Sequence, residues 1–215
     1  MIKTLIVSGG SINEVFFKEL ILKNKYDNII ASDKGLETLD KFNIKPNYII
    51  GDFDSINLKV LNKYLDDDTI NITRLNPIKD FTDTHMALKL GINIKSNDIT
   101  IVGAIGTRID HTIANISVLK EALEKNISCK IENENNSIML INKNTIIEKD
   151  DNYKYISLIP LTSTVSGITL KGFKYSLNNS KIKIGQSIGV SNEQIEQKGK
   201  IEIKKGILIV LRTKD

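Results

Sequence analysis

The stretch Tyr48-Ile49-Ile50-Gly51-Asp52-Phe53-Asp54-Ser55 places two aspartates directly behind a short apolar run. Runs of this kind, apolar on both faces, are typical of strands inside a sheet. If the chain stays extended, Asp52 and Asp54 point the same way, about 6 to 7 Å apart, because side chains alternate along a strand. Two carboxylates at about 5 Å repel by roughly 3 kcal/mol at an effective dielectric of about 20. The stretch therefore predicts either a cation between the carboxylates or a shifted pKa, and we interpret it as a metal site.

Outward from this stretch, residues 1–135 alternate short apolar runs with longer segments of helical spacing. The predicted strands are residues 3–7, 28–31, 48–50, 69–72, 99–102 and 128–131, and the predicted helices are residues 15–22, 36–42, 58–65, 84–92 and 112–123. Strands that are apolar on both faces and separated by helices indicate a mostly parallel, doubly wound α/β sheet with helices on both faces. We expect this α/β domain to span residues 1–135.

Beyond residue 135 the helical spacing stops and short apolar segments follow one another. The predicted strands are residues 138–141, 145–148, 155–161, 164–170, 181–184, 200–204 and 207–211. Lys205 and Gly206 between the last two runs predict an antiparallel hairpin. The pattern predicts a second, all-β domain over residues 144–215.

The overall composition is that of an ordinary soluble globular protein, with 215 residues, 40% hydrophobic and 26% charged. The net charge of +4 is spread over single lysines, which suits an anionic small molecule and does not favour nucleic acid. Cys129 is the single cysteine and cannot form an internal disulfide, and no signal segment or membrane span stands out. We expect a cytoplasmic protein with no membrane partner.

Further acidic residues follow the predicted strands. Asp33 comes after one strand, Asp110 lies in the loop after another, and Asp80 and Asp83 stand between a strand and a helix. In open α/β sheets, the carboxyl ends of the strands form the ligand crevice. Several carboxylates on that edge suit Mg²⁺, which takes a few carboxylate ligands and completes its shell with substrate phosphates and water. Phosphoryl chemistry on a nucleotide is the function that this pattern favours.

A loop with basic and glycine residues supports the same interpretation. Residues 103–111, Gly-Ala-Ile-Gly-Thr-Arg-Ile-Asp-His, follow a strand and open a helix, so that backbone N–H groups can approach an anion and Arg108 can clamp phosphate oxygens. Lys79 offers a second positive charge. The alternative is a plain turn in which Asp110 caps the helix. The loop has neither the Walker motif nor the dinucleotide fingerprint.

Four phrases together resemble the thiamine pyrophosphokinase (thiamine diphosphokinase) family. They are Gly51-Asp-Phe-Asp-Ser55, Lys79-Asp-Phe-Thr-Asp-Thr84, the loop 103–111 and Gly189-Val-Ser-Asn-Glu193, in this order over nearly the whole chain. The resemblance implies an α/β nucleotide domain followed by a β-sandwich, a homodimer with the active site shared between subunits, and Mg²⁺-dependent conversion of ATP and thiamine to AMP and thiamine diphosphate.

The resemblance also implies roles for individual residues. Asp52, Asp54 and Asp80 correspond to the acidic residues around Mg²⁺ and the phosphates, and together with Arg108 they form the expected catalytic set. The residues expected at ATP are Asp33, Lys79, Thr82, Asp83, Arg108 and Asp110, and those expected at thiamine are Tyr175, Ser191 and Asn192. The implied reaction is attack by the thiamine hydroxyl on the β-phosphorus, with the general base left open between Asp54 and Asp80.

Several residues have a simpler structural interpretation. We expect His85, where relatives commonly carry Glu, to face solvent or a crevice wall, and His111 to fix its loop. Asp66-Asp67-Asp68 precedes a strand and is interpreted as a solvated turn, whereas Ser8-Gly9-Gly10-Ser11 is either a nucleotide contact or a tight turn.

Two other functions remain open on the sequence. One is a pyrophosphokinase for another hydroxymethyl heterocycle such as a pterin. The other is a non-catalytic nucleotide sensor, for which so many carboxylates are not needed.

Overall fold

The computed structural model describes residues 1–78 and 80–215. The chain divides into two compact units, Met1–Glu134 and Asn135–Asp215. The limits predicted for two domains, 1–135 and 144–215, stay a prediction. Within the described residues, no helix has both the length and the apolar character needed to cross a membrane.

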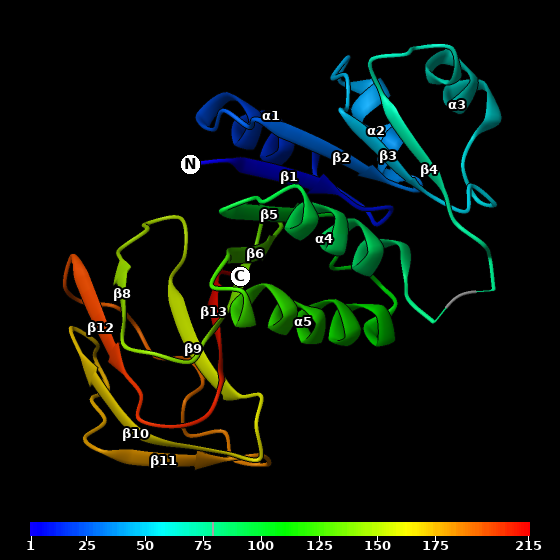
Figure 1. The fold of residues 1–215 in the computed structure, drawn as a ribbon. Helices are drawn as coiled ribbons and strands as arrows, with labels where there is room; N and C mark the ends of the chain where they lie inside the picture. The colour runs from blue at the N-terminus through cyan, green and yellow to red at the C-terminus, as the bar shows by residue number, and fades with distance from the viewer. Residues whose placement is uncertain (79) are drawn as a thin grey trace. The chain divides into compact units, whose positions relative to one another are not determined.

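The first unit is built on six parallel strands (Figure 1). They are β1 (Lys3–Val7), β2 (Asn28–Ser32), β3 (Tyr48–Gly51), β4 (Asn71–Arg74), β5 (Asp98–Val102) and β6 (Ser128–Glu132). Their order is β4-β3-β2-β1-β5-β6, and every neighbouring pair is parallel. The central strands are apolar on both faces, which confirms the predicted parallel sheet.

Helices cover both faces of this sheet. They are α1 (Glu14–Lys23), α2 (Gly35–Lys41), α3 (Leu58–Leu65), α4 (Asp83–Asn93) and α5 (Ile109–Glu124). One core cluster joins Phe17 of α1, Leu39 of α2 and Leu61 of α3 to alternate strand residues such as Leu5. On the other face, a Cβ at Gly91 of α4 would lie 3.2 Å from Cδ1 of Ile99, and Figure 1 shows α4 and α5 side by side. The doubly wound arrangement is therefore confirmed.

Side-chain caps start several of these helices. Asn13 accepts from the N–H of Phe16, Asn57 from that of Lys59, and the hydroxyl of Thr82 from that of His85. These bonds satisfy backbone donors that have no partner inside the first helical turn. The cap at Thr82 matters for function because it fixes the point where α4 begins.

The second unit contains two antiparallel sheets. One consists of β7 (Asn136–Ile141), β13 (Leu208–Thr213) and β9 (Tyr155–Pro160), in the order β7-β13-β9. The other consists of β8 (Thr145–Glu148), β10 (Thr164–Lys171), β11 (Ser180–Lys183) and β12 (Lys198–Glu202), in the order β11-β10-β12-β8. Buried residues of both sheets, among them Leu158, Val210, Ile168 and Ile201, form one apolar cluster. The unit is a β-sandwich, as the resemblance implied.

The predicted hairpin at residues 200–211 is wrong. β12 pairs with β10 and β8, whereas β13 pairs with β7 and β9, so the two strands lie in different sheets. Gly206 between them has φ +103°, and a Cβ there would lie 2.7 Å from the carbonyl oxygen of Thr164. Gly206 therefore lies where the chain crosses from one sheet to the other. The sequence could not show this, because both strands place alternate apolar residues in the shared core, and that pattern is the same for a hairpin and for a crossover.

Candidate active site

A cavity of about 500 Å³ opens at the carboxyl ends of the parallel strands. It is lined by Gly9, Gly10, Ser11, Ser32, Asp33, Lys34, Ser55, Thr82, Asp83, Thr84, Gly103, Ala104, Gly106, Thr107, Arg108, His111 and Asn115. The strand order runs one way from β1 to β2 and the other way from β1 to β5, so β1 and β5 flank the point where the winding reverses. Ligands of open α/β sheets bind in the crevice at this point. The cavity is therefore the candidate active site.

Two glycines allow close backbone contact at the floor of this cavity. The N–H of Gly10 donates to the carbonyl oxygen of Gly103 at 2.9 Å. A Cβ at Gly10 would lie 2.4 Å from that oxygen, and Gly103 itself has φ +69°. The Ser8-Gly9-Gly10-Ser11 segment is thus a tight turn packed on the 103–108 loop, and it also lines the cavity. Both interpretations of this segment are compatible, because the turn itself forms the wall.

Three carboxylates converge beside the cavity. Among the described residues, Asp33, Asp52 and Asp54 each offer an oxygen, and these oxygens lie within 4.8 Å of one another. Asp33 follows β2, and the other two follow β3, its neighbour in the sheet. The N–H of Asp33 donates to the carbonyl oxygen of Ile50 at 2.9 Å, which ties the two strand ends together. The sheet edge therefore brings together carboxylates that are about 20 residues apart in sequence.

The convergence arises from a turn and not from an extended strand. β3 ends at Gly51, and Phe53 between the two aspartates has φ +65° while its ring is buried. Asp33 also has a positive φ, +47°. Left-handed backbone is unfavourable for a bulky residue such as Phe, and it persists only where surrounding packing imposes it. The apolar core holds Phe53 in this conformation, and the flanking carboxylates face the same side as a result.

The three carboxylates have more negative charge and more acceptor oxygens than the surrounding described residues satisfy. The charge of Asp52, followed by a hydrogen bond between the two side chains, raises the pKa of Asp54 above its ordinary value. Oδ1 of Asp33 is buried and has no hydrogen-bond partner among the described residues, whereas Oδ2 accepts from the hydroxyl of Ser55 at 2.5 Å. A buried carboxylate oxygen without a donor is costly. A hard cation would satisfy both features, because it offers positive charge to all three residues.

The segment 80–84 carries other predicted residues. Thr82, Asp83 and Thr84 line the cavity, and the hydroxyl of Thr84 donates to that of Ser8 at 3.0 Å. Asp80 is exposed and does not belong to the three-carboxylate group found among the described residues. Lys79 lies outside the described residues. The assignment of Asp80 to the metal therefore stays a prediction, and Asp33, expected near the nucleotide, joins Asp52 and Asp54 in the described group.

Arg108 projects from the rim of the cavity with its charge already paired. Its Nη2 lies 2.5 Å from Oδ2 of Asp110, and its Nε donates to Oδ1 at 3.3 Å. This hydrogen bond lowers the pKa of Asp110 and raises that of Arg108. Both side chains are exposed, so the pair is easily exchanged with solvent or an anion. A phosphate group entering the cavity would compete with Asp110 for the guanidinium.

Asn115 and Thr112 of α5 hold the 103–108 loop from below. The buried side chain of Asn115 donates through Nδ2 to the carbonyl oxygen of Ala104 at 2.8 Å. The hydroxyl of Thr112 accepts from the N–H of Gly106 at 3.3 Å. Neither residue was among the predicted site residues, although Asn115, a polar residue on the buried face of a helix, is a signal that the sequence carries. His111 lines the same cavity, where we expected it to fix the loop.

The residues predicted to contact thiamine lie in the second unit. Asn192 is buried, and its amide group brackets the backbone of Tyr175: Oδ1 accepts from the N–H of Tyr175 at 2.9 Å, and Nδ2 donates to its carbonyl oxygen at 2.7 Å. The ring of Tyr175 is exposed, with the ammonium group of Lys174 5.6 Å from its centroid. Ser191 is exposed at φ +58°. Asn192 thus fixes the backbone of Tyr175, while the ring of Tyr175 stays exposed.

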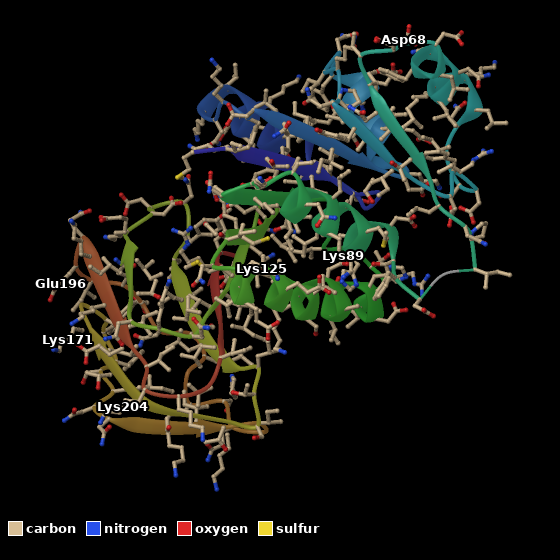
Figure 2. All side chains as sticks on the ribbon, in the orientation of Figure 1. Asp68, Lys89, Lys125, Lys171, Glu196 and Lys204 are labelled. Atoms are coloured by element: carbon tan, nitrogen blue, oxygen red, sulfur yellow. The ribbon has the colours of Figure 1, made fainter. Side chains whose placement is uncertain are left out.

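One further expectation concerns residues away from the cavity. Asp66-Asp67-Asp68 lies beyond the end of α3 at the edge of the sheet opposite the cavity, where Oδ1 of Asp67 accepts from the N–H and hydroxyl of Thr69. Figure 2 shows Asp68 at the surface there. This confirms the interpretation as a turn. Cys129 lies in β6, and burial raises the pKa of its thiol.

Comparisons with known proteins agree over both units. Residues 19–131 match the family model for the catalytic domain of thiamin pyrophosphokinase, and residues 143–208 match that for its vitamin B1 binding domain. Thiamine pyrophosphokinase of Bacillus subtilis is 36% identical over 194 residues, which are 86% of this chain and 87% of that protein.

Solved structures lead to the same family. The crystal structure of thiamine pyrophosphokinase from Bacillus subtilis has a TM-score of 0.90 at 33% identity and covers 99% of each chain. That of thiamin pyrophosphokinase from Geobacillus thermodenitrificans has a TM-score of 0.87 at 28% identity and covers 100% of this chain and 98% of that one. These matches give no support to the pterin kinase or to the nucleotide sensor. In sequence and in fold, this chain belongs to the thiamine pyrophosphokinase family.

Proposed function

We propose that this chain transfers the pyrophosphoryl group of ATP to the hydroxyl group of thiamine, giving thiamine diphosphate and AMP in a Mg²⁺-dependent reaction. The observation that carries the proposal is the group of three carboxylates, Asp33, Asp52 and Asp54, beside a cavity of about 500 Å³ that ends at a glycine-rich loop. Carboxylates at a phosphate site require a mediating cation. The membership in the family adds the identity of the acceptor.

The donor set suits Mg²⁺. Asp33, Asp52 and Asp54 offer only oxygen ligands, and Oδ1 of Asp33 is buried without a hydrogen-bond donor among the described residues. We assign these three residues as the ones that would hold the ion, with Asp80 completing the set when phosphate is present. A bound Mg²⁺ supplies positive charge that offsets the negative charge gathering on the transferred group.

The chain's own residues bind and orient the triphosphate. Residues of the 103–108 loop line the cavity where α5 begins, and the N-terminus of a helix favours an anion. Arg108 exchanges Asp110 for phosphate oxygens, and Thr82 and Asp83, which line the cavity, contact the nucleotide as well. The sequence assigns Lys79 to the same ligand. Lys79 lies outside the described residues. Positioning and electrostatic stabilisation are the expected sources of catalysis, as in other phosphoryl transfers.

The chemical step is a displacement at the β-phosphorus. The hydroxyl oxygen of thiamine forms a bond to this phosphorus, the bond from the phosphorus to the oxygen bridging the α- and β-phosphates breaks, and AMP leaves with that oxygen. The hydroxyl proton is released to a base. Tyr175 covers the flat cationic heterocycle of thiamine, and Ser191 and Asn192 contact the same substrate. Asn192 also holds the backbone of Tyr175.

The assembly and the location belong to the same proposal. We propose a homodimer whose active site is shared between subunits, on the resemblance of the 189–193 phrase and of the second unit to the thiamine-binding part of the family. We propose a cytoplasmic location because the single cysteine, Cys129, makes no use of an oxidising compartment.

The direct test is turnover by purified protein. The protein is incubated with ATP, Mg²⁺ and thiamine, and the nucleotide and thiamine products are separated by chromatography. We expect AMP and thiamine diphosphate in equal amounts, and neither when Mg²⁺ is replaced by excess chelator. ADP as the nucleotide product, or turnover of a hydroxymethylpterin in place of thiamine, would overturn the proposal. Sedimentation of the active protein tests the dimer, because an active monomer contradicts a shared site.

A further inference from the structure

Four side chains beside the cavity form a closed cluster that the reaction itself does not require. They are Phe81 in the loop before α4, His85 and Lys89 on α4, and Glu121 on α5. Nε2 of His85 lies 2.6 Å from Oε1 of Glu121, and Nζ of Lys89 lies 3.1 Å from Oε2 of the same carboxylate. The carboxylate of Glu121 is therefore held from both sides by residues of the neighbouring helix.

Phe81 closes the cluster through its ring. The ring meets the imidazole of His85 edge to face, with centroids 4.7 Å apart and an interplanar angle of 75°, and Nζ of Lys89 lies 4.9 Å from its centroid. Aromatic edge-to-face pairs and cation–π contacts are both attractive. Phe81 is nevertheless 42% exposed, so it does not belong to the main core. Its ring is attached to α4 and α5 by these specific contacts.

The expected orientation of His85 is thereby corrected. We expected a first-turn residue facing solvent or a crevice wall, but its side chain is only 13% exposed and is held between Glu121 and Phe81. The sequence could not show this pairing, because Glu121 lies 36 residues away on another helix.

The position of Phe81 in the chain gives the cluster a consequence for the active site. Phe81 stands between Asp80 and Thr82, and Thr82, Asp83 and Thr84 line the cavity. A ring fixed at residue 81 restricts the backbone on both sides of it, because consecutive residues share peptide planes. The cluster therefore acts on the segment that carries one wall of the nucleotide site.

We propose that Phe81, His85 and Glu121 are positioning residues that hold the 80–83 segment in place for the triphosphate of ATP. Lys89 supports the same carboxylate. The proposal rests on the proposed function for the identity of the ligand, but the ordering of the segment is a property of the free protein. Loss of the cluster should raise the KM for ATP and leave the KM for thiamine nearly unchanged, which a merely structural role would not do.

The test uses Glu121→Gln and His85→Ala, with Glu124→Gln as the matched control. Glu124 lies on the same helix and forms an ion pair of similar length, 2.9 Å to Lys120, outside the cluster. We expect each cluster variant to raise the KM for ATP about tenfold, which corresponds to about 1.4 kcal/mol, because residues of one network are energetically coupled. The control should stay within about twofold, and thermal unfolding should show that all variants are folded.

A second measurement does not depend on activity. The chain contains no tryptophan, so Phe81→Trp gives a single-tryptophan protein whose time-resolved anisotropy reports motion at residue 81. We expect Glu121→Gln in this background to increase the fast local motion of Trp, and Glu124→Gln to leave it unchanged. Unchanged motion in both would overturn the proposal.

The two measurements separate the possible failures. If wild-type protein makes no thiamine diphosphate, the proposed function fails. The affinity for α,β-methylene ATP in the presence of Mg²⁺, measured by calorimetry, then replaces the KM. Greater motion together with weaker nucleotide binding supports positioning. Greater motion with unchanged KM and unchanged nucleotide affinity would overturn it, because the segment would then be ordered without consequence for ATP.

Discussion

The hydroxyl of Ser55 donates to Oδ2 of Asp33 at 2.5 Å, while the other oxygen of that carboxylate is buried and has no donor within residues 1–78 and 80–215. Ser55 belongs to the loop after β3, and Asp33 to the loop after β2, so the bond orients an aspartate across two strand ends. The second oxygen of this carboxylate remains available to a ligand. Asp33 also contributes an oxygen to the group with Asp52 and Asp54 whose ligand atoms lie within 4.8 Å of one another, which makes these three residues the candidate metal site.

Asp52→Asn should separate metal binding from folding. Asn keeps an oxygen that can accept from the N–H of Asp54, as Oδ1 of Asp52 does at 3.2 Å. Because changes in the groups that merely support metal ligands cost about 10- to 100-fold, loss of a ligand should lower Mg²⁺-dependent turnover by at least about 100-fold. Unchanged turnover would contradict the assignment of Asp52 to the metal.

The same variant has a second expected effect in chelator, where the metal does not contribute. The pKa of Asp54 is raised by Asp52, so the folded state binds that proton more tightly than the unfolded state. Its contribution to stability is therefore present at low pH and is lost as the pH rises through the raised pKa. Asp52→Asn should remove this loss. At neutral pH in chelator its thermal midpoint should equal or exceed that of the wild type, and a clearly lower midpoint would argue against repulsion at the site.

Asp67 should titrate far below an ordinary aspartate. A hydrogen bond from Lys45, followed by those from Thr69, lowers the pKa of Asp67 to about 2. The stabilisation from this group is present above the unfolded-state pKa and is lost as the pH falls from about 4 through about 2. Lys45→Gln should move the pKa of the Asp67 carboxyl upward, measured by NMR titration. Lys63→Gln, which breaks an ion pair with Asp40, should leave it unchanged.

Asn192 should matter for stability as well as for substrate. Replacing it by Ala leaves the N–H and carbonyl groups of Tyr175 without their partner, and a lost buried hydrogen bond costs roughly 1 to 3 kcal/mol. We expect Asn192→Ala to lower the free energy of unfolding by about that amount in urea titrations. Ser191→Ala should stay within about 0.5 kcal/mol, because Ser191 is exposed. Equal stability of both variants would show that the bracket contributes nothing.

Gly35 should not tolerate a side chain. A Cβ there would lie 1.8 Å from the carbonyl oxygen of Val7, so Gly35→Ala must displace α2 from β1. We expect a loss of at least about 1 to 3 kcal/mol in the free energy of unfolding, as in other overpacked sites. Gly106 is the control, since a Cβ there would meet no atom within 4 Å. A stable Gly35→Ala protein with an unchanged thermal midpoint would contradict the close packing of α2.

The β–α rhythm of the first 135 residues was readable because its signals are local. Helical spacing in residues 58–65 and the apolar run at residues 3–7 appear as elements with those same bounds. The last pair of strands shows the limit of local signals. Alternating apolar residues around Gly206 suit a hairpin and a crossover equally well. Only the strand pairing distinguishes them, since β12 pairs with β10 and β13 pairs with β9.

The site shows the same division. The sequence by itself determined the fold class, the family and the two aspartates behind β3, because periodicity and short phrases are properties of neighbouring residues. The tertiary structure decided which carboxylates meet. Phe53 in a left-handed turn brings Asp52 and Asp54 to one side, and pairing of β2 with β3 adds Asp33 to them. It also decided that His85 meets Glu121, since a contact across 36 residues depends on how α4 and α5 pack, which no local pattern of residues specifies.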